Sequence, residues 1–245
     1  MWSAEGIILH KRVFAEDKYI VTLFSRDLGK SQGMIRKSTN MPGDLVSAVW
    51  SGRSGSLGFF KFDTVYSAFL HIAHDALRLY CLQAACDLCM TCMQTNDAHP
   101  ALFESLQTLL CEIGKNQWLL YYVFFELELL HEIGFGLALY SCAVNGSTND
   151  LLYISPKTGR AVSRQAGEAY RDKLFKMPSC FQSYISSSVL AMDNATGEEE
   201  CLDATDILTG LEITRYFLQK HVVLAVPQAR LSFEKDLRQY VQKSI

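Results

Sequence analysis

The first 67 residues alternate short apolar, β-branched runs with turn residues. In the last of these runs Phe60 and Phe62 alternate with Lys61 and Asp63, the period of two that is typical of a strand with one buried face. The sequence predicts five strands, near residues 6–14, 19–25, 30–37, 45–50 and 59–66. Five strands in about 65 residues is the size of a small closed barrel, so we expect a five-stranded OB-fold over residues 1–67.

From residue 68 onwards the apolar positions follow a helical period. Residues 68–94 contain no glycine or proline and predict one long helix. Prolines stand at the first positions of two later helices, and Asp203 is a suitable cap for another. The predicted helices cover 68–94, 100–114, 118–134, 178–192, 204–223 and 227–243, while 141–164 is irregular or weakly strand-like. The expected fold class is therefore α+β multidomain, with a mostly α-helical domain over residues 68–245.

Composition places the chain among ordinary globular proteins, with 49% hydrophobic and 20% charged residues. There is no export signal at the start and no apolar run of the ~18 residues that a membrane helix needs. Eight cysteines then indicate a reducing compartment, and we expect a soluble cytoplasmic protein that has no contact with a membrane.

The net charge of −3 is unevenly distributed. Residues 1–67 carry nine Lys and Arg against six Asp and Glu, whereas residues 68–138 carry two against eight. An anionic partner is therefore expected at the barrel. The candidate DNA-binding residues are Lys11, Arg12, Lys30, Arg36, Lys37, Arg53 and Lys61, interleaved with the aromatic residues Phe14, Tyr19, Trp50, Phe59 and Phe60. The alternative interpretation is a solvated barrel surface around an aromatic core.

Three cysteines spaced three residues apart raise the question of a metal site. On a helix they would spread over roughly 9 Å rather than converge on one ion, and cysteine is a common small core residue. We interpret Cys86, Cys89 and Cys92 as core residues. The HEIGF motif at His131 is half of a zincin pattern, but Phe135 stands where the second histidine is needed. No catalytic set, metal or cofactor is predicted; a cysteine-based metal or redox enzyme is the third-ranked alternative, which metal analysis would test.

Two segments carry a family resemblance. FELELLHEIGFGL (125–137), followed by CAVNGSTNDLLYISPKTGRAVS (142–163), closely resembles the RecO family of bacterial recombination mediators. GIILHKRVFAEDKYIVTLFSRDLGK (6–30) resembles the first barrel strands of that family, and MPGDLVSAVW (41–50) with LGFF (57–60) resembles the fourth and fifth. The resemblance implies an N-terminal OB-fold and a helical C-terminal domain.

The resemblance also implies a function that is not enzymatic. Members bind single- and double-stranded DNA, anneal complementary strands, and partner with RecR and the C-terminal tail of single-stranded DNA-binding protein. They help to load RecA onto coated single strands during repair. The competing hypothesis is a protein-interaction adaptor with little or no DNA affinity, which the salt dependence of binding would distinguish.

The chain departs from the family pattern at a zinc site that many members have. Cys142 keeps the first ligand position, but Asn145 takes the second, and the later cysteine pair would fall near Ser163 and Ala166. One thiolate cannot hold a tetrahedral zinc ion. We therefore expect no metal in this zinc-finger-like segment.

A second departure concerns the tail of the single-strand binding protein. Relatives often have an arginine just before FEL, where this chain has Val123 and Phe124. An apolar groove between the helices at 118–133 and 204–223 is our hypothesis for the tail's binding site, with Arg215 and Lys220 as a basic rim.

Overall fold

The computed structural model describes residues 1–53, 55–190, 203–222 and 226–244. Its contacts divide the chain into two units, one of residues 1–125 with 226–236 and the other of residues 126–225 with 237–245. The boundary falls within one helix, α4 (Trp118–Glu132).

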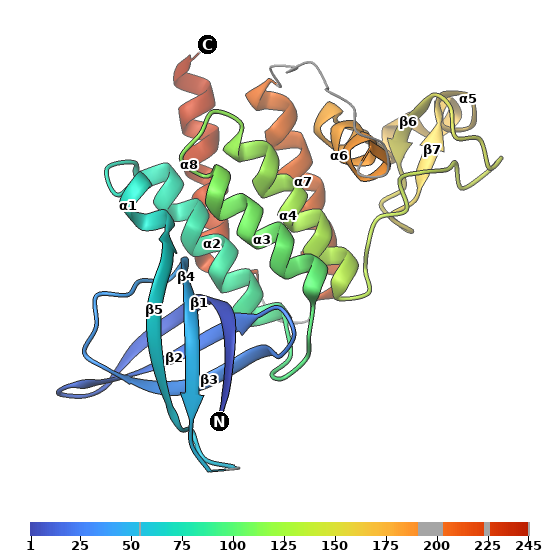
Figure 1. Ribbon diagram of the computed structural model, residues 1–245. Helices are drawn as coiled ribbons and strands as arrows, with labels where there is room; N and C mark the ends of the chain where they lie inside the picture. Colours follow the sequence, from blue (N-terminus) through green and yellow to red (C-terminus); the bar gives the residue numbers. More distant parts are fainter. Residues whose placement is uncertain (54, 191–202, 223–225, 245) are drawn as a thin grey trace. The chain divides into compact units, whose positions relative to one another are not determined.

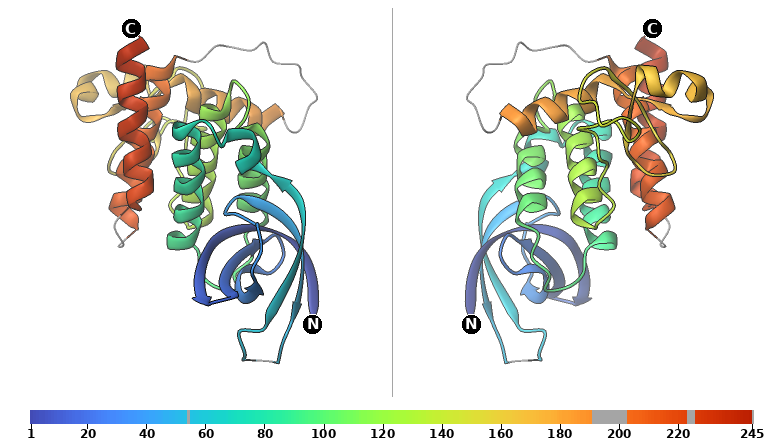
Figure 2. Two further views of the ribbon diagram at one scale, coloured as in Figure 1. Left: turned by 90° about the vertical axis from the view of Figure 1, so that its left-hand side faces the viewer. Right: turned by 90° about the vertical axis from the view of Figure 1, so that its right-hand side faces the viewer.

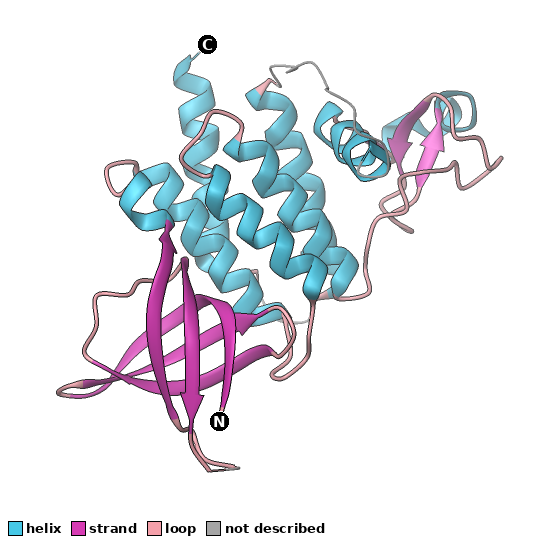
Figure 3. Ribbon diagram, in the orientation of Figure 1, coloured by secondary structure: helices cyan, strands magenta, loops and turns pink. Residues whose placement is uncertain are grey.

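The first unit begins with a closed five-stranded barrel whose strand order is β1-β2-β3-β5-β4 (Figure 1; Figure 3, magenta). This confirms the predicted barrel followed by helices. Neighbouring strands are antiparallel except β3 and β5, which close the barrel through one parallel pair, Met34 with Phe59. The strands are β1 (Trp2–Ala15), β2 (Lys18–Ser25), β3 (Gly29–Arg36), β4 (Asp44–Ser51) and β5 (Phe59–Ser67).

Strand β1 is long because it pairs with two strands, β4 and β2. Its first half pairs with β4 and its second half with β2, with a register shift between Ile8 and His10. The extra residue there bends the strand around the barrel, as β-bulges do. Figure 2 shows β4 and β5 (cyan) projecting as a hairpin past the other strands.

Alternate residues of the strands fill the barrel with apolar side chains. The buried cluster consists of Ile8, Val21, Leu23, Ile35, Val46, Ala48 and Phe60. Gly33 is required beside this cluster, because a Cβ there would lie 2.6 Å from the Phe60 ring. The middle of the barrel is therefore closely packed.

The predicted helix over 68–94 is wrong in one respect, because the structure has two helices there, α1 (Ala68–Ile72) and α2 (Ala76–Cys92). The Asp75 side chain accepts a hydrogen bond from the Arg78 amide and caps α2, so the chain restarts at that point. Cys86 and Cys89 are fully buried in α2, which confirms them as core residues, whereas Cys92 is half-buried.

The helix α3 (Pro100–Glu112) confirms the predicted element, and the start of α8 (Gln228–Ser244) completes the unit. The Phe233 ring of α8 lies 4.8 Å from the Tyr122 ring and 6.0 Å from the Trp118 ring, both in α4. One turn away, the buried Arg230 forms an ion pair with the buried Glu234. Residues 226–236, although about 100 residues further along the chain, therefore belong to the core of the first unit.

The second unit contains a small sheet, ordered β7-β6-β8, and two longer helices. The Asp206 carboxylate, on α7, accepts hydrogen bonds from the Ser179 and Cys180 amides and so caps the start of α6. Asp203 caps α7 as predicted. The elements are β6 (Leu151–Ile154), β7 (Ala161–Ser163), α5 (Arg164–Gly167), the 3₁₀ helix η1 (Glu168–Lys173), β8 (Phe175–Lys176), α6 (Ser179–Leu190) and α7 (Ala204–His221). None of the helices in the described ranges is both long enough and apolar enough to cross a membrane.

Candidate nucleic-acid interface

Three basic side chains share the outward face of β1, β2 and β3. Arg12 pairs with Ile20 in register, and Lys18 pairs directly with Arg36. Because residues 18 and 20 are two apart on β2, their side chains and those of their partners point to the same side of the sheet. We call Arg12, Lys18 and Arg36 the basic face.

The basic face is accessible to a ligand. Arg12 and Arg36 are exposed and Lys18 is half-buried. Within the described part of the chain, no carboxylate forms an ion pair with any of the three. The adjacent tip of the β1–β2 hairpin presents Val13 and Phe14, with 70% and 57% of their surfaces exposed. A mixture of free cations and exposed apolar side chains suits the phosphates and bases of a single strand.

Lys18 was missed by the sequence analysis because it lies in the turn-like stretch AEDK. Periodicity within one strand does not show which residues of neighbouring strands are paired. Only the register, Lys18 opposite Arg36, reveals that the two charges are adjacent.

Two of the predicted DNA-binding lysines donate hydrogen bonds to backbone carbonyl oxygens within the first unit. Lys30 is only 8% exposed, and its Nζ donates to the Met90 and Met93 carbonyl oxygens at 2.6 and 2.8 Å. These carbonyls lie at the end of α2, where a cation is favoured by the helix dipole. Burial lowers the Lys30 pKa. Its ammonium group faces the helix end rather than solvent.

Lys11 occupies a similar position beside the β3–β4 loop. Its Nζ donates to the Ser38 and Asn40 carbonyl oxygens at 2.7 and 2.9 Å and lies 4.6 Å from the centre of the Tyr19 ring. Burial lowers the Lys11 pKa, and the nearby Asp44 carboxylate opposes this effect. The structure thus gives both lysines internal partners.

The remaining three predicted residues do not join the basic face. Lys61 lies on the outward face of β5 between Phe59 and Asp63. Arg53 lies in the β4–β5 loop, where its backbone is hydrogen bonded with Ser56 Oγ. Lys37 is exposed just after β3, where its amide donates to the Asp17 carbonyl oxygen. The structure therefore brings together only Arg12 and Arg36 of the seven predicted residues.

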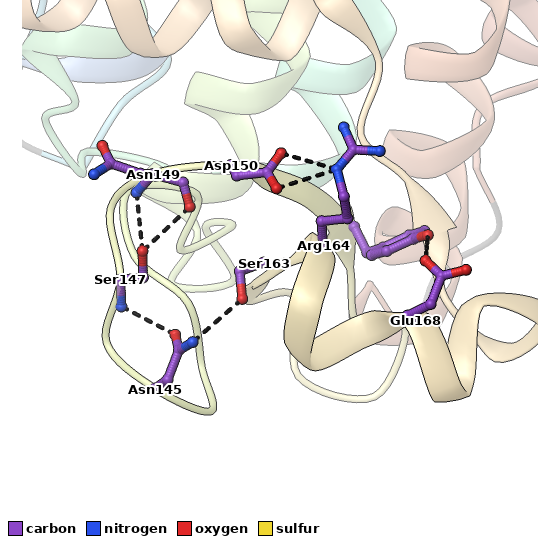
Figure 4. Close-up of polar contacts among 8 residues, drawn as sticks. Asn145, Ser147, Asn149, Asp150, Ser163, Arg164 and Glu168 are labelled. Carbon is purple, nitrogen blue, oxygen red and sulfur yellow. Dashed lines mark hydrogen bonds and ion pairs between the residues drawn. The ribbon is translucent and has the colours of Figure 1, made fainter.

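The zinc-finger-like segment of the second unit is held by hydrogen bonds between the residues that replace cysteines. Asn145 Nδ2 donates to Ser163 Oγ at 3.4 Å, and the Ser147 amide donates to Asn145 Oδ1 (Figure 4). Cys142 Sγ accepts hydrogen bonds from the Val144 and Ser163 amides. In the described ranges, no group of three or more His, Cys, Asp or Glu side chains is placed to hold a metal ion.

Two family comparisons cover nearly the whole chain. Residues 1–67 match the family described as "Recombination protein O N terminal", and residues 73–229 match "Recombination protein O C terminal". The chain belongs to the RecO family.

Individual RecO proteins agree with this result. The chain is 33% identical to the "DNA repair protein RecO" of Anaplasma marginale (strain Florida) over 227 residues, covering 91% of this chain and 92% of the relative. It is 34% identical to the protein of the same name from Rhodospirillum centenum, covering 95% and 92%, and 34% identical to that of Methylobacterium nodulans, covering 95% and 96%. The match thus extends over both units.

The hydrogen bonds to Cys142 Sγ change the pKa of its thiol. Burial alone would raise the pKa of the thiol, but hydrogen bonds from Ser163, Asn145 and Val144 outweigh it and lower the pKa to about 7. These hydrogen bonds from the Ser163 side chain and from backbone amides stabilise the thiolate form of Cys142.

This shift predicts a pH-dependent stabilisation of residues 142–163. A thiol whose pKa is lower in the folded state stabilises that state above the unfolded pKa, and the stabilisation is lost as pH falls through about 7. We expect hydrogen exchange of this segment to be slower in the wild type than in Cys142→Ser at pH 8.5, with a smaller difference at pH 6.5. An equal difference at both pH values would contradict the thiolate.

The predicted groove between α4 and α7 is closed where Thr214 and Glu126 join the two helices. Thr214 Oγ1 of α7 donates to the Glu126 carboxylate of α4, and both residues are fully buried. The rim residue Lys220 donates instead to the Pro156 and Lys157 carbonyl oxygens, and Arg215 is half-buried with partners of its own. A nearby cavity of about 170 Å³ is lined by residues that include Leu127, Leu139 and Tyr184.

Proposed function

We propose that this RecO-family chain works in DNA repair and recombination by binding single-stranded DNA and assisting its annealing. The observation that carries the proposal is the basic face, where Arg12, Lys18 and Arg36 lie together on the barrel without ion-pair partners among the described residues. Their side chains would neutralise phosphates and release counterions. Bases turned away from the face would stay free to pair with a second strand.

The partners follow from the family resemblance. RecR, the C-terminal tail of single-stranded DNA-binding protein, and RecA as the recombinase to be loaded are part of the proposal, as is binding to double-stranded DNA. The action is non-enzymatic, because the proposal needs only binding and release. Relatives named "DNA repair protein RecO" support the repair context.

Binding of a fluorescently labelled 30-mer single strand tests the proposal. We expect the dissociation constant, followed by anisotropy, to rise steeply with salt, with a slope of about 0.7 for each phosphate neutralised. Replacing Arg12, Lys18 and Arg36 by glutamine should weaken binding and reduce the slope by about 2.

A matched control removes three exposed lysines from the second unit, Lys157, Lys173 and Lys176. Both triple variants change the net charge equally, so a specific role for the basic face requires the control to retain more affinity. If the wild type does not bind even at low salt, the adaptor hypothesis replaces this proposal.

A further inference from the structure

A cavity of about 720 Å³ lies at the end of the barrel where β1 begins and β4 ends. Its walls include Trp2 and Trp50 on the barrel, Ser31 and Gln32 on β3, and Thr95 and Asn96 after α2. All of these residues belong to the first unit. The volume is within the usual range of small-molecule sites. The cavity is separate from the basic face, since none of that face's three residues lines it.

The cavity contains a rigid aromatic wall. The Trp2 and Trp50 rings are nearly parallel, with 10° between their planes and 6.2 Å between their centres. Trp50 Nε1 donates to the Leu57 carbonyl oxygen, and the backbone of Gly58 approaches the same ring so closely that a Cβ would lie 2.4 Å from it. The Trp50 ring therefore cannot rotate without moving the β4–β5 loop.

The cavity lining also includes polar residues, and the backbone of two of them, Thr95 and Asn96, is held against β3. The backbone of Thr95 pairs with that of Lys30 in an isolated parallel β-bridge. The Asn96 amide donates a hydrogen bond to the Lys30 carbonyl oxygen. Asn96 has a φ of 59°, a left-handed conformation that asparagine tolerates. The hydroxyl of Ser31 is buried and has no hydrogen-bond partner among the described residues.

The chemistry of these walls selects a ligand class. The only charged group among the described residues that line the cavity is the α-ammonium of Met1, and no Lys or Arg side chain lines it to bind a phosphate. A flat aromatic surface together with hydroxyl and amide groups suits an uncharged planar group with hydrogen-bonding edges. We infer that the cavity takes up an unstacked nucleobase of the single strand whose phosphates the basic face binds. This inference rests on the proposed function and deepens it.

Two oligonucleotides of equal length and charge separate base capture from phosphate binding. One is a 20-mer of thymidine, and the other is a 20-mer of abasic sites with the same phosphates. We expect the wild type to bind the thymidine strand about tenfold more tightly or better, the range for stacking of one or a few bases. Fluorescence of Trp2 and Trp50 should be quenched by the thymidine strand and not by the abasic one.

Substitutions then locate the effect. Trp2→Leu keeps an apolar side chain at the rim and should bring the two affinities together without changing the affinity for the abasic strand. Asn96→Gly keeps the left-handed backbone and should reduce the preference in the same direction. Tyr80→Leu, which removes an exposed aromatic residue of α2, is the matched control and should retain the full preference.

The outcomes distinguish the two proposals. Equal wild-type affinity for both strands overturns the base site and leaves phosphate binding intact. An equal loss of both affinities in Trp2→Leu also overturns it, because a structural role alone would give that result. If neither strand binds the wild type, both proposals fail. The comparison of strands uses the wild type, so a variant that does not fold leaves the main test in place.

Discussion

Replacing Arg230 by methionine should destabilise the first unit by about 3–5 kcal/mol. Arg230 has no exposed surface, and its guanidinium forms an ion pair with Glu234, which is 2% exposed. The substitution removes this ion pair from the buried Glu234 carboxylate, and breaking a buried pair costs far more than the pair itself contributes. The expected loss is a large fraction of the about 5–15 kcal/mol by which folded domains are usually stable.

Urea unfolding followed by tryptophan fluorescence measures this effect directly, because Trp2, Trp50 and Trp118 all belong to the first unit. The double variant Arg230→Met/Glu234→Leu should recover much of the loss, since it replaces both charges by apolar groups. A single variant as stable as the wild type would show that the pair is solvated, contrary to its burial.

Replacing Lys30 by methionine should also destabilise the first unit, by about 2 kcal/mol. The ammonium group satisfies two carbonyl oxygens at the end of α2, and methionine cannot donate to them. Lys37→Met is the matched control, because Lys37 is an exposed lysine of the same barrel, and we expect it to change stability by less than about 0.5 kcal/mol.

The same two variants distinguish a structural role of Lys30 from a direct contact with DNA phosphates. At a temperature where Lys30→Met is folded, its salt slope for single-strand binding should equal that of the wild type. A reduced slope with unchanged stability would assign Lys30 to a phosphate contact and contradict the internal position seen here.

Local patterns predicted those elements whose signals lie within one segment. The alternation in residues 59–66, Pro100 at the start of α3 and Asp203 at the start of α7 all correspond to observed elements. The break before α2 was missed, because Asp75 sits in a stretch without glycine or proline, and a capping side chain can also lie on a helix surface. Only the hydrogen bond to the Arg78 amide distinguishes the two cases.

The candidate site was harder to predict, because composition does not show which basic residues are exposed and which form hydrogen bonds inside the protein. Lys30 and Arg36 lie on the same strand, yet one binds carbonyl oxygens of α2 and the other is exposed beside Lys18. The difference depends on what packs against each part of the strand. The Trp2–Trp50 contact likewise joins the first strand to the fourth through their register, which no local pattern contains.

The first unit is built from two stretches of the chain that are far apart in the sequence, and this affects its folding during synthesis. Residues 226–236 supply Phe233 and Arg230 to a unit that otherwise ends at residue 125. Synthesis proceeds at about 5–20 residues per second, so residues 126–225 alone take roughly 5–20 s. During that time the surface of α4 that later receives Phe233 is uncovered in the nascent chain. The helical core of the first unit therefore cannot be completed until almost the whole chain has been made.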